Sequence, residues 1–136
     1  MSGREIDMMT QDSLRFYKSH SFYTQFGGIV LDREEGKRIA KALGGGKAVI
    51  LQNHGLLTVG QSVDEAAFWL ISLDKTCHAQ LLVDAASAGS GHKKILIDDA
   101  ETAFSYGQVG KPEKSWLAFR GYYDEQLAKS NGNFLK

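Results

Sequence analysis

The sequence predicts an α/β domain of 136 residues, and three neighbouring segments support that prediction. An uninterrupted apolar run, Ala48–Leu51, has the pattern of a central strand covered on both faces. A second apolar run at 56–59 follows a short polar turn and predicts a neighbouring strand. The pattern Ser62-Val63-Asp64-Glu65 then predicts a capping box, with Ser62 bonding forward and Glu65 bonding back. Behind it, apolar residues recur at helical spacing: Ala66, Ala67, Leu70, Leu73, Cys77, Leu81 and Ala85.

The flanking segments complete the predicted order of elements. Glycine, proline and N-capping side chains mark the ends of helices, because each favours a backbone conformation or hydrogen bond found there. The expected helices cover residues 12–20, 34–43, 62–88, 98–106 and 112–127, and a short strand covers 25–31. In the second helix, Ile39, Ala40 and Leu43 are expected to face inward. Residues 95–97 are either a brief strand or an apolar loop.

Composition and charge argue against several functional classes. Sixteen basic and sixteen acidic side chains cancel, which argues against nucleic acid as an obligatory partner and against a polybasic membrane surface. The apolar runs are too short to span a bilayer, and no signal-peptide-like segment follows Met1. The single Cys77 cannot form an intrachain disulfide framework or a cysteine-based zinc finger. A reducing, cytoplasmic location is therefore expected.

His54 is the candidate metal ligand of this sequence. It stands in the turn Asn53-His54-Gly55 between the two predicted strands, and Gly55 leaves room for a ligand to approach. The alternative is a histidine that merely satisfies backbone groups in the turn. Of the other histidines, His78 is expected at a surface or interface, whereas His20 and His92 are expected in solvated loops.

Other chemistry-bearing residues have structural explanations. Cys77 lies on the apolar face of the long helix, where a thiol is usually a small core residue. The glycine run at 44–46 precedes a strand, so it lacks the helix N-terminus that a phosphate cradle uses. Trp116, Phe119 and Tyr123 share one helix face and are expected to form a core or subunit contact. No His-x-His or His-Glu-x-x-His pattern accompanies His54.

Residues 48–86 closely resemble part of the class II aldolase/adducin family, in particular fuculose-phosphate-aldolase-like proteins. The matching pieces are the strand that ends in Gln52-Asn53-His54-Gly55, the return strand, and the capping pattern that opens the long helix. The upstream stretch Phe26-Gly27-Gly28-Ile29-Val30 also agrees. The resemblance is best over 8–88 and corresponds to the C-terminal half of the family domain. It identifies 1–136 as a single domain of this kind, truncated at its N-terminal side.

The resemblance implies a fold and an activity. The family fold is a three-layer α/β/α sandwich around a mixed, mostly antiparallel sheet. Family enzymes are class II aldolases, which use Zn²⁺ or another divalent metal to cleave a phosphorylated sugar such as L-fuculose 1-phosphate reversibly into dihydroxyacetone phosphate and an aldehyde. The histidine of the Asn-His-Gly motif, here His54, corresponds to the third zinc ligand. A homo-oligomer is expected, since family members usually assemble as tetramers.

The sequence departs from the family pattern in its ligand set. The first two zinc ligands of the family come from an upstream His-x-His motif, and its proton-transferring glutamate lies upstream too. No residue here matches them, so no catalytic or substrate-binding residue is assigned. The chain is then a fragment of a longer enzyme, a shortened member with a different site, or a non-catalytic, adducin-like module that self-associates.

Overall fold

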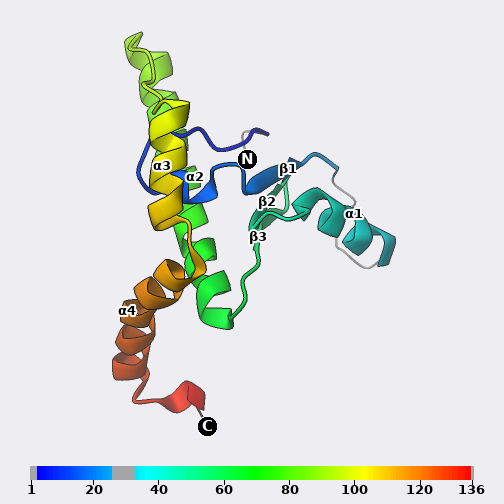
Figure 1. Cartoon of the computed structure of the whole chain (residues 1–136), viewed down its shortest axis with the longest axis vertical. Coiled ribbons are helices and arrows are strands. Elements are labelled where there is room, and N and C mark those ends of the chain that lie inside the picture. The colour runs from blue at the N-terminus through cyan, green and yellow to red at the C-terminus, as the bar shows by residue number, and fades with distance from the viewer. Residues whose placement is uncertain (1–2, 26–32, 136) are drawn as a thin grey trace.

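The structure is a computed structural model that describes residues 3–25 and 33–135. In chain order, its elements are η1 (Ser13–Phe16), β1 (His20–Tyr23), α1 (Arg33–Leu43), β2 (Ala48–Leu51), β3 (Gly55–Thr58), α2 (Val63–Ser90), α3 (Asp99–Val109), α4 (Pro112–Ser130) and η2 (Asn133–Leu135). Helix α2 is the longest and connects the sheet region to the rest of the helical side (Figure 1). Within the described residues, no helix is both long and apolar enough to cross a bilayer.

The three strands form one mixed sheet with β2 in the middle. Strand β1 runs parallel to β2, with His20 beside Ala48, and β3 runs antiparallel to β2, with Leu57 beside Val49. All four residues of β2 are buried, as expected for a strand covered on both faces. The sequence prediction of a central strand and an antiparallel return strand is confirmed.

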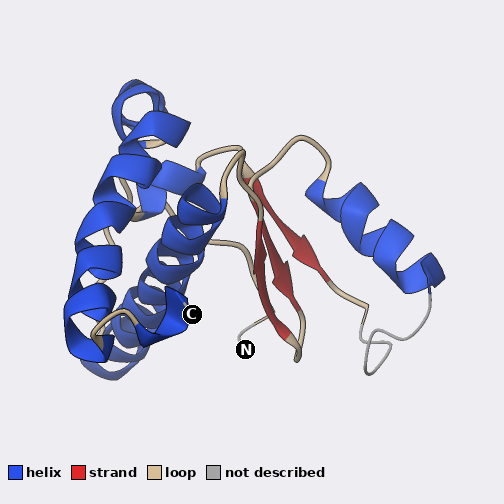
Figure 2. Ribbon diagram, turned by 90° about the horizontal axis from the view of Figure 1, so that it is seen from below, coloured by secondary structure: helices blue, strands red, loops and turns tan. Residues whose placement is uncertain are grey.

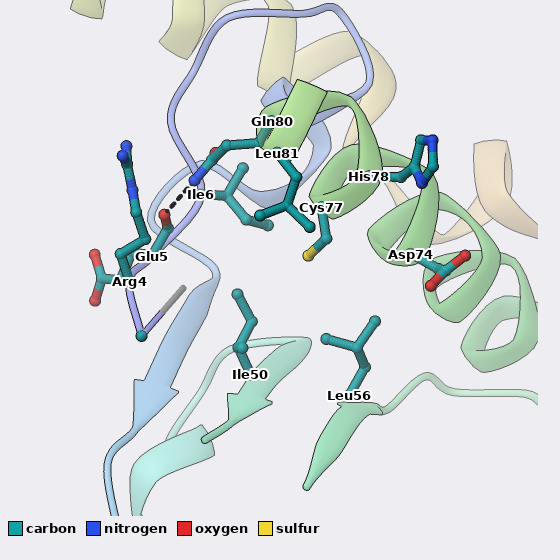
Figure 3. Close-up of a pocket in the computed structure, with 11 residues that line it drawn as sticks. Arg4, Glu5, Ile6, Ile50, Leu56, Asp74, Cys77, His78, Gln80 and Leu81 are labelled. Carbon is teal, nitrogen blue, oxygen red and sulfur yellow. Dashed lines mark hydrogen bonds between the residues drawn. The ribbon is translucent and has the colours of Figure 1, made fainter. Parts of the chain in front are cut away.

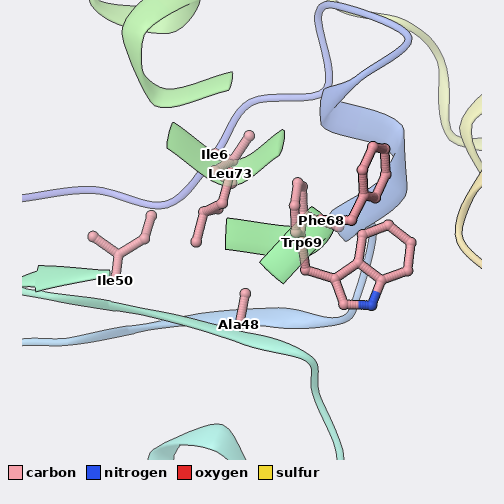
Figure 4. Packing of buried hydrophobic residues seen from close by; sticks show 7 residues of the cluster. Ile6, Ala48, Ile50, Phe68, Trp69 and Leu73 are labelled. Atoms are coloured by element: carbon pink, nitrogen blue, oxygen red, sulfur yellow. The ribbon is translucent and has the colours of Figure 1, made fainter. Parts of the chain in front are cut away.

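Helices cover both faces of this sheet, so the predicted three-layer α/β/α sandwich is confirmed. Helix α1 lies on one side of the strands, and the remaining helices lie on the other (Figure 2). The core on the α2 side, part of which Figure 4 shows, consists of Ile6, Phe16, Ala48, Ile50, Phe68, Trp69 and Leu73. The core on the α1 side is smaller and consists of Tyr23, Ile39, Val49 and Leu51.

The ends of α2 follow from local chemistry. The Ser62 hydroxyl accepts a hydrogen bond from the Glu65 backbone N–H at 3.2 Å, which confirms the forward half of the predicted capping box. The Glu65 carboxylate accepts its return bond from the backbone N–H of Gln61 at 2.7 Å, one residue before the cap. At the other end, Gly91 takes a left-handed conformation with φ of 71° and ends the helix.

The glycine run after α1 brings two backbone segments together. Gly44 ends the helix with a positive φ of 53°. A Cβ atom at Gly46 would lie 2.9 Å from the carbonyl oxygen of Ser19, too close for any side chain. A Cβ atom at Gly45, in contrast, would have no neighbour within 4 Å. The run is a loop before β2, as predicted.

The N-terminal region differs from its prediction. The helix expected over 12–20 is only the short 3-10 helix η1, and strand β1 begins at His20. Because β1 is stabilised by pairing with β2, which lies far along the chain, local propensity does not reveal it. Most of the strand expected at 25–31 falls outside the described residues.

The buried face of α2 is also rotated relative to the predicted one. Leu70 and Leu81, expected to face inward, are 43% and 50% exposed. Leu73 is buried as predicted, and the other buried residues are Glu65, Phe68, Trp69, Ser72, Thr76 and Gln80. The helix contacts α4, both neighbouring strands and η1, so several partners decide which face is covered. In α1, similarly, Ile39 is buried and Ala40 is exposed.

Candidate metal-binding site

The candidate ligand lies in the loop that joins β2 to β3. Because Leu51 pairs with Gly55, this loop contains only Gln52, Asn53 and His54. Asn53 has a left-handed φ of 55°, which asparagine adopts more readily than most residues. The His54 N–H donates to the Leu51 carbonyl at 3.1 Å, and the Gln52 N–H donates to the Tyr23 carbonyl of β1 at 2.9 Å. The backbone that carries His54 is therefore fixed to two strands.

The imidazole of His54 is exposed at the rim of a hollow of about 670 Å³. Leu51, Leu57 and residues of α1 line the same hollow. Within the described residues, the ring takes part in no hydrogen bond or ion pair. A Cβ at Gly55 would likewise meet nothing within 4 Å. The ring nitrogens are thus open to a ligand, and they do not satisfy backbone groups of the turn.

The described residues do not supply a complete metal site around this ring. In residues 3–25 and 33–135, no group of three or more His, Cys, Asp or Glu side chains is arranged to hold a metal ion. A catalytic zinc site has three protein ligands and one open position. His54 therefore fits one ligand position, and the described part of the chain by itself does not fit a bound zinc ion.

His20 differs from its prediction, because it is a structural residue. It opens β1 and is half-buried. Its Nε2 accepts a hydrogen bond from the Ile6 N–H at 3.1 Å, and its Nδ1 lies 2.7 Å from the Phe16 carbonyl oxygen, to which it donates. Both nitrogens are engaged, so His20 holds the N-terminal segment against β1. His78 and His92 are exposed, as expected.

Cys77 lies beside a second, smaller cavity of about 190 Å³ between α2, the sheet and the N-terminal segment. Its sulfur points toward Ile50 and Leu56, whereas His78 points away from them (Figure 3). Burial, with a smaller contribution from the charge of Asp74, raises the pKa of the Cys77 thiol. The thiol is therefore protonated at neutral pH and packs as a small apolar group, as predicted.

Lys47 is a residue that sequence reasoning missed. Its ammonium lies 4.0 Å from the ring centre of Trp69 and 5.1 Å from that of Tyr106, and it donates to the Gly110 carbonyl at 2.6 Å. Burial lowers the pKa of Lys47 to about 8, although the nearby Glu65 carboxylate opposes this. Lys47 joins the start of β2 to the junction of α3 and α4. Its position after a glycine run gave no sign of this role.

The family model described as Class II Aldolase and Adducin N-terminal domain matches residues 1–81. Its match includes η1, all three strands, the His54 loop and the first part of α2. The sequence-based resemblance to class II aldolases and adducins is therefore confirmed.

Individual relatives include proteins with different activities. The 4-hydroxy-3-prenylphenylpyruvate oxygenase/4-hydroxy-3-prenylbenzoate synthase of Streptomyces roseochromogenus subsp. oscitans is 40% identical, over 94% of this chain and 44% of its own length. Alpha-adducin of Rattus norvegicus is 37% identical, over 66% of this chain and 12% of its own length.

A solved structure has the same fold. The L-fuculose 1-phosphate aldolase of Glaciozyma antarctica PI12 matches with a TM-score of 0.82 and 34% identity, over 95% of this chain and 46% of that one. The chain thus spans less than half the length of this aldolase and of the Streptomyces relative.

Proposed function

The chain belongs to the class II aldolase and adducin family, and on that basis we propose that it works as part of a metal-dependent sugar-phosphate aldolase. The substrate class is a phosphorylated sugar such as L-fuculose 1-phosphate, cleaved reversibly to dihydroxyacetone phosphate and an aldehyde. The observation that carries the proposal is the exposed and unengaged imidazole of His54 on a loop fixed by backbone hydrogen bonds. The 34% identity to a fuculose-phosphate aldolase supports the substrate class.

In this proposal His54 is one ligand of a divalent cation such as Zn²⁺. The loop backbone is already ordered by the strands on either side, so binding a cation costs little additional conformational entropy there. A three-ligand site needs at least one donor from beyond the described residues of one copy, because no three-donor group exists within them. Residues 1–136 act as one domain that presents this ligand in the loop between β2 and β3.

A second candidate function is a non-catalytic, adducin-like assembly module. Two observations favour it: the 37% identity to alpha-adducin, and the lack of a three-donor metal group among the described side chains. In this alternative the same hairpin serves packing or association, and His54 binds no metal.

Metal binding decides between the two candidates. The purified chain is titrated with Zn²⁺ and with Co²⁺, and bound metal is measured by equilibrium dialysis and by the Co²⁺ absorption spectrum. The aldolase proposal expects binding that His54→Ala weakens at least tenfold. His92→Ala, which removes another exposed imidazole, is the matched control and is expected to bind as the unmodified chain does. Equal binding by both variants, or none by the unmodified chain, contradicts the role of His54.

Turnover is measured separately. Release of dihydroxyacetone phosphate from L-fuculose 1-phosphate is followed with added Zn²⁺, and a phenylpyruvate is assayed in parallel because of the Streptomyces relative. Turnover of the sugar phosphate that His54→Ala abolishes supports the aldolase. A metal-free chain that self-associates and turns over neither substrate supports the adducin-like module.

A further inference from the structure

The ring of His20 is held in one protonation state by the two backbone groups that it contacts. The Phe16 carbonyl oxygen, 2.7 Å from Nδ1, can only accept a hydrogen bond, so Nδ1 carries the proton. The Ile6 N–H, 3.1 Å from Nε2, can only donate, so Nε2 is an unprotonated acceptor. Both bonds therefore require the neutral imidazole. A proton at Nε2 would place one N–H group against another.

The bond from Ile6 holds residues 4–8, the N-terminal segment, against β1. The Ile6 side chain is 6% exposed and belongs to the α2-side core. Gln80 of α2 holds the same segment from the other side. Its amide nitrogen donates to the Glu5 carbonyl at 3.0 Å, and its amide oxygen accepts from the Asp7 N–H at 2.6 Å. The segment is therefore fixed between β1 and α2, and His20 supplies its bond to β1.

The N-terminal segment also forms a wall of the small cavity beside Cys77. Arg4, Glu5 and Ile6 line this cavity of about 190 Å³ together with Cys77 (Figure 3). Cys77 packs against the core cluster that contains Ile6. If the segment left β1, the Cys77 thiol would lose part of its cover, and the cavity would become open to solvent.

We propose that His20 is a pH-dependent latch: protonation of its imidazole releases the N-terminal segment from β1 and opens the Cys77 cavity. In the closed state Nε2 accepts from the Ile6 N–H. In acid Nε2 becomes a donor, and the buried Ile6 N–H loses its acceptor. Because the closed state binds fewer protons than the open state, closure is favoured as pH rises and is lost as pH falls. Histidine changes its charge between about pH 5 and 8, so the latch works in that range.

Ion pairs tether the outer side of the N-terminal segment. Lys94, between α2 and α3, donates to the carboxylates of Asp7 and Asp84. Burial opposes the change, but hydrogen bonds from Lys94 and Arg4 lower the pKa of Asp7. These pairs therefore persist while His20 titrates, so the segment opens on its β1 side and stays attached to α2. The titratable and charged side chains of the segments on this side of β1 are Arg4, Glu5, Asp7, Arg15, Tyr17, Lys18, Lys47, Cys77 and Asp84.

The first test measures the reactivity of Cys77, the single cysteine of the chain. A dithiodipyridine, which reacts with thiols in acid, is added to the metal-free chain. Each rate is divided by that of the urea-unfolded chain at the same pH, which removes the pH dependence of the thiol itself. For the unmodified chain this ratio is expected to be about tenfold higher at about pH 5.5 than at about pH 7.5.

Variants at position 20 and beside it show which group is responsible. His20→Gln cannot gain a proton in this range, and its amide oxygen can still accept a hydrogen bond, so the dependence on pH is expected to disappear. Glu5→Gln and His92→Gln, which each remove an exposed titratable side chain, are the controls and are expected to keep it. No rise in the unmodified chain, or an equal rise in His20→Gln, overturns the proposal. Loss of the helical circular dichroism over the same pH range would mean global unfolding and also overturns it.

The second test needs no variant at position 20. In ¹H–¹⁵N spectra of the metal-free chain at neutral pH, the His20 ring is expected as the Nδ1–H tautomer. On acidification the Ile6 amide signal is expected to shift with the same midpoint as the His20 ring, and not with His78 or His92, which are exposed. An Nε2–H tautomer, or an Ile6 amide that does not follow the ring, overturns the latch. Neither test involves metal or substrate, so its failure is distinguishable from failure of the proposed function.

Discussion

The two faces of the sheet are built differently. On the α2 side, Phe16, Trp69 and Leu73 are completely buried. On the α1 side, the core is smaller, Ile39 is 8% exposed, and a hollow of about 670 Å³ stays open beside it. The α2 side therefore supplies most of the packing energy. The α1 side and the loop between β2 and β3 provide the accessible groups, among them His54, on which the proposed function depends.

Paired truncations on the two faces give the largest expected effect. Trp69→Ala is expected to lower the free energy of unfolding by about 3–5 kcal/mol, because it empties a fully buried site and removes the donor to the Glu65 carboxylate. Ile39→Ala is expected to cost about 2 kcal/mol, since its site already borders open space. Urea unfolding measures both. Trp116→Ala, at a position 52% exposed, is the control and is expected to change little. Equal losses of unfolding free energy for Trp69→Ala and Ile39→Ala would contradict the conclusion that the α2 side supplies most of the packing energy.

A smaller effect is expected from the half-buried ammonium of Lys47 on the α2 side. The pKa of Lys47 is about 8 in the folded chain and has an ordinary value of 10.5. Between these values the unfolded state binds more protons, so stability rises with pH across this window. The rise is on the order of 1 kcal/mol after allowance for partial exposure. Unfolding at pH 7.5 and pH 10.5 is compared for the unmodified chain and Lys47→Met, and the difference between them isolates Lys47 from other titrating groups. The same pH dependence in both would refute this explanation.

The smallest effect concerns the start of α2. Ser62→Ala removes the hydroxyl that accepts from the Glu65 N–H and is expected to cost about 0.5 kcal/mol, with Ser62→Asp restoring most of it. The loss is expected to be small because Glu65 is also held by Gln61 and Trp69. If Ser62→Ala lowered the free energy of unfolding as much as Ile39→Ala does, the cap would stabilise the chain as much as the Ile39 side chain does. Urea midpoints are sufficient for this comparison.

Local chemistry predicted the elements whose determinants lie within a few residues. The apolar run of β2 and the Ser62 cap were both found this way. Strand β1 was missed because its stabilising partner, β2, is distant in sequence. The prediction of the buried face of α2 was wrong for a related reason. Helix α4 and the N-terminal segment cover positions that hydrophobicity alone did not select.

The candidate site also contains residues that local sequence predicts and residues whose roles depend on distant segments. The turn around His54 was predicted from asparagine and glycine, and the structure places His54 in an exposed loop between the two expected strands. His20 was misjudged, because its bonds to Ile6 and Phe16 exist only after β1 has formed. Lys47 was missed because its aromatic neighbours come from two helices far along the chain. A side chain held by distant segments leaves no pattern in its own surroundings.

The three consecutive glycines before β2 have different tolerances for substitution. Gly44 needs its left-handed backbone, and Gly46 lies too close to the Ser19 carbonyl to accept a side chain. Gly45 has neither constraint. A cysteine at this middle position would therefore offer an attachment point for a spin label or fluorophore, a short distance from β2, with which conformational changes of the hairpin could be followed in solution.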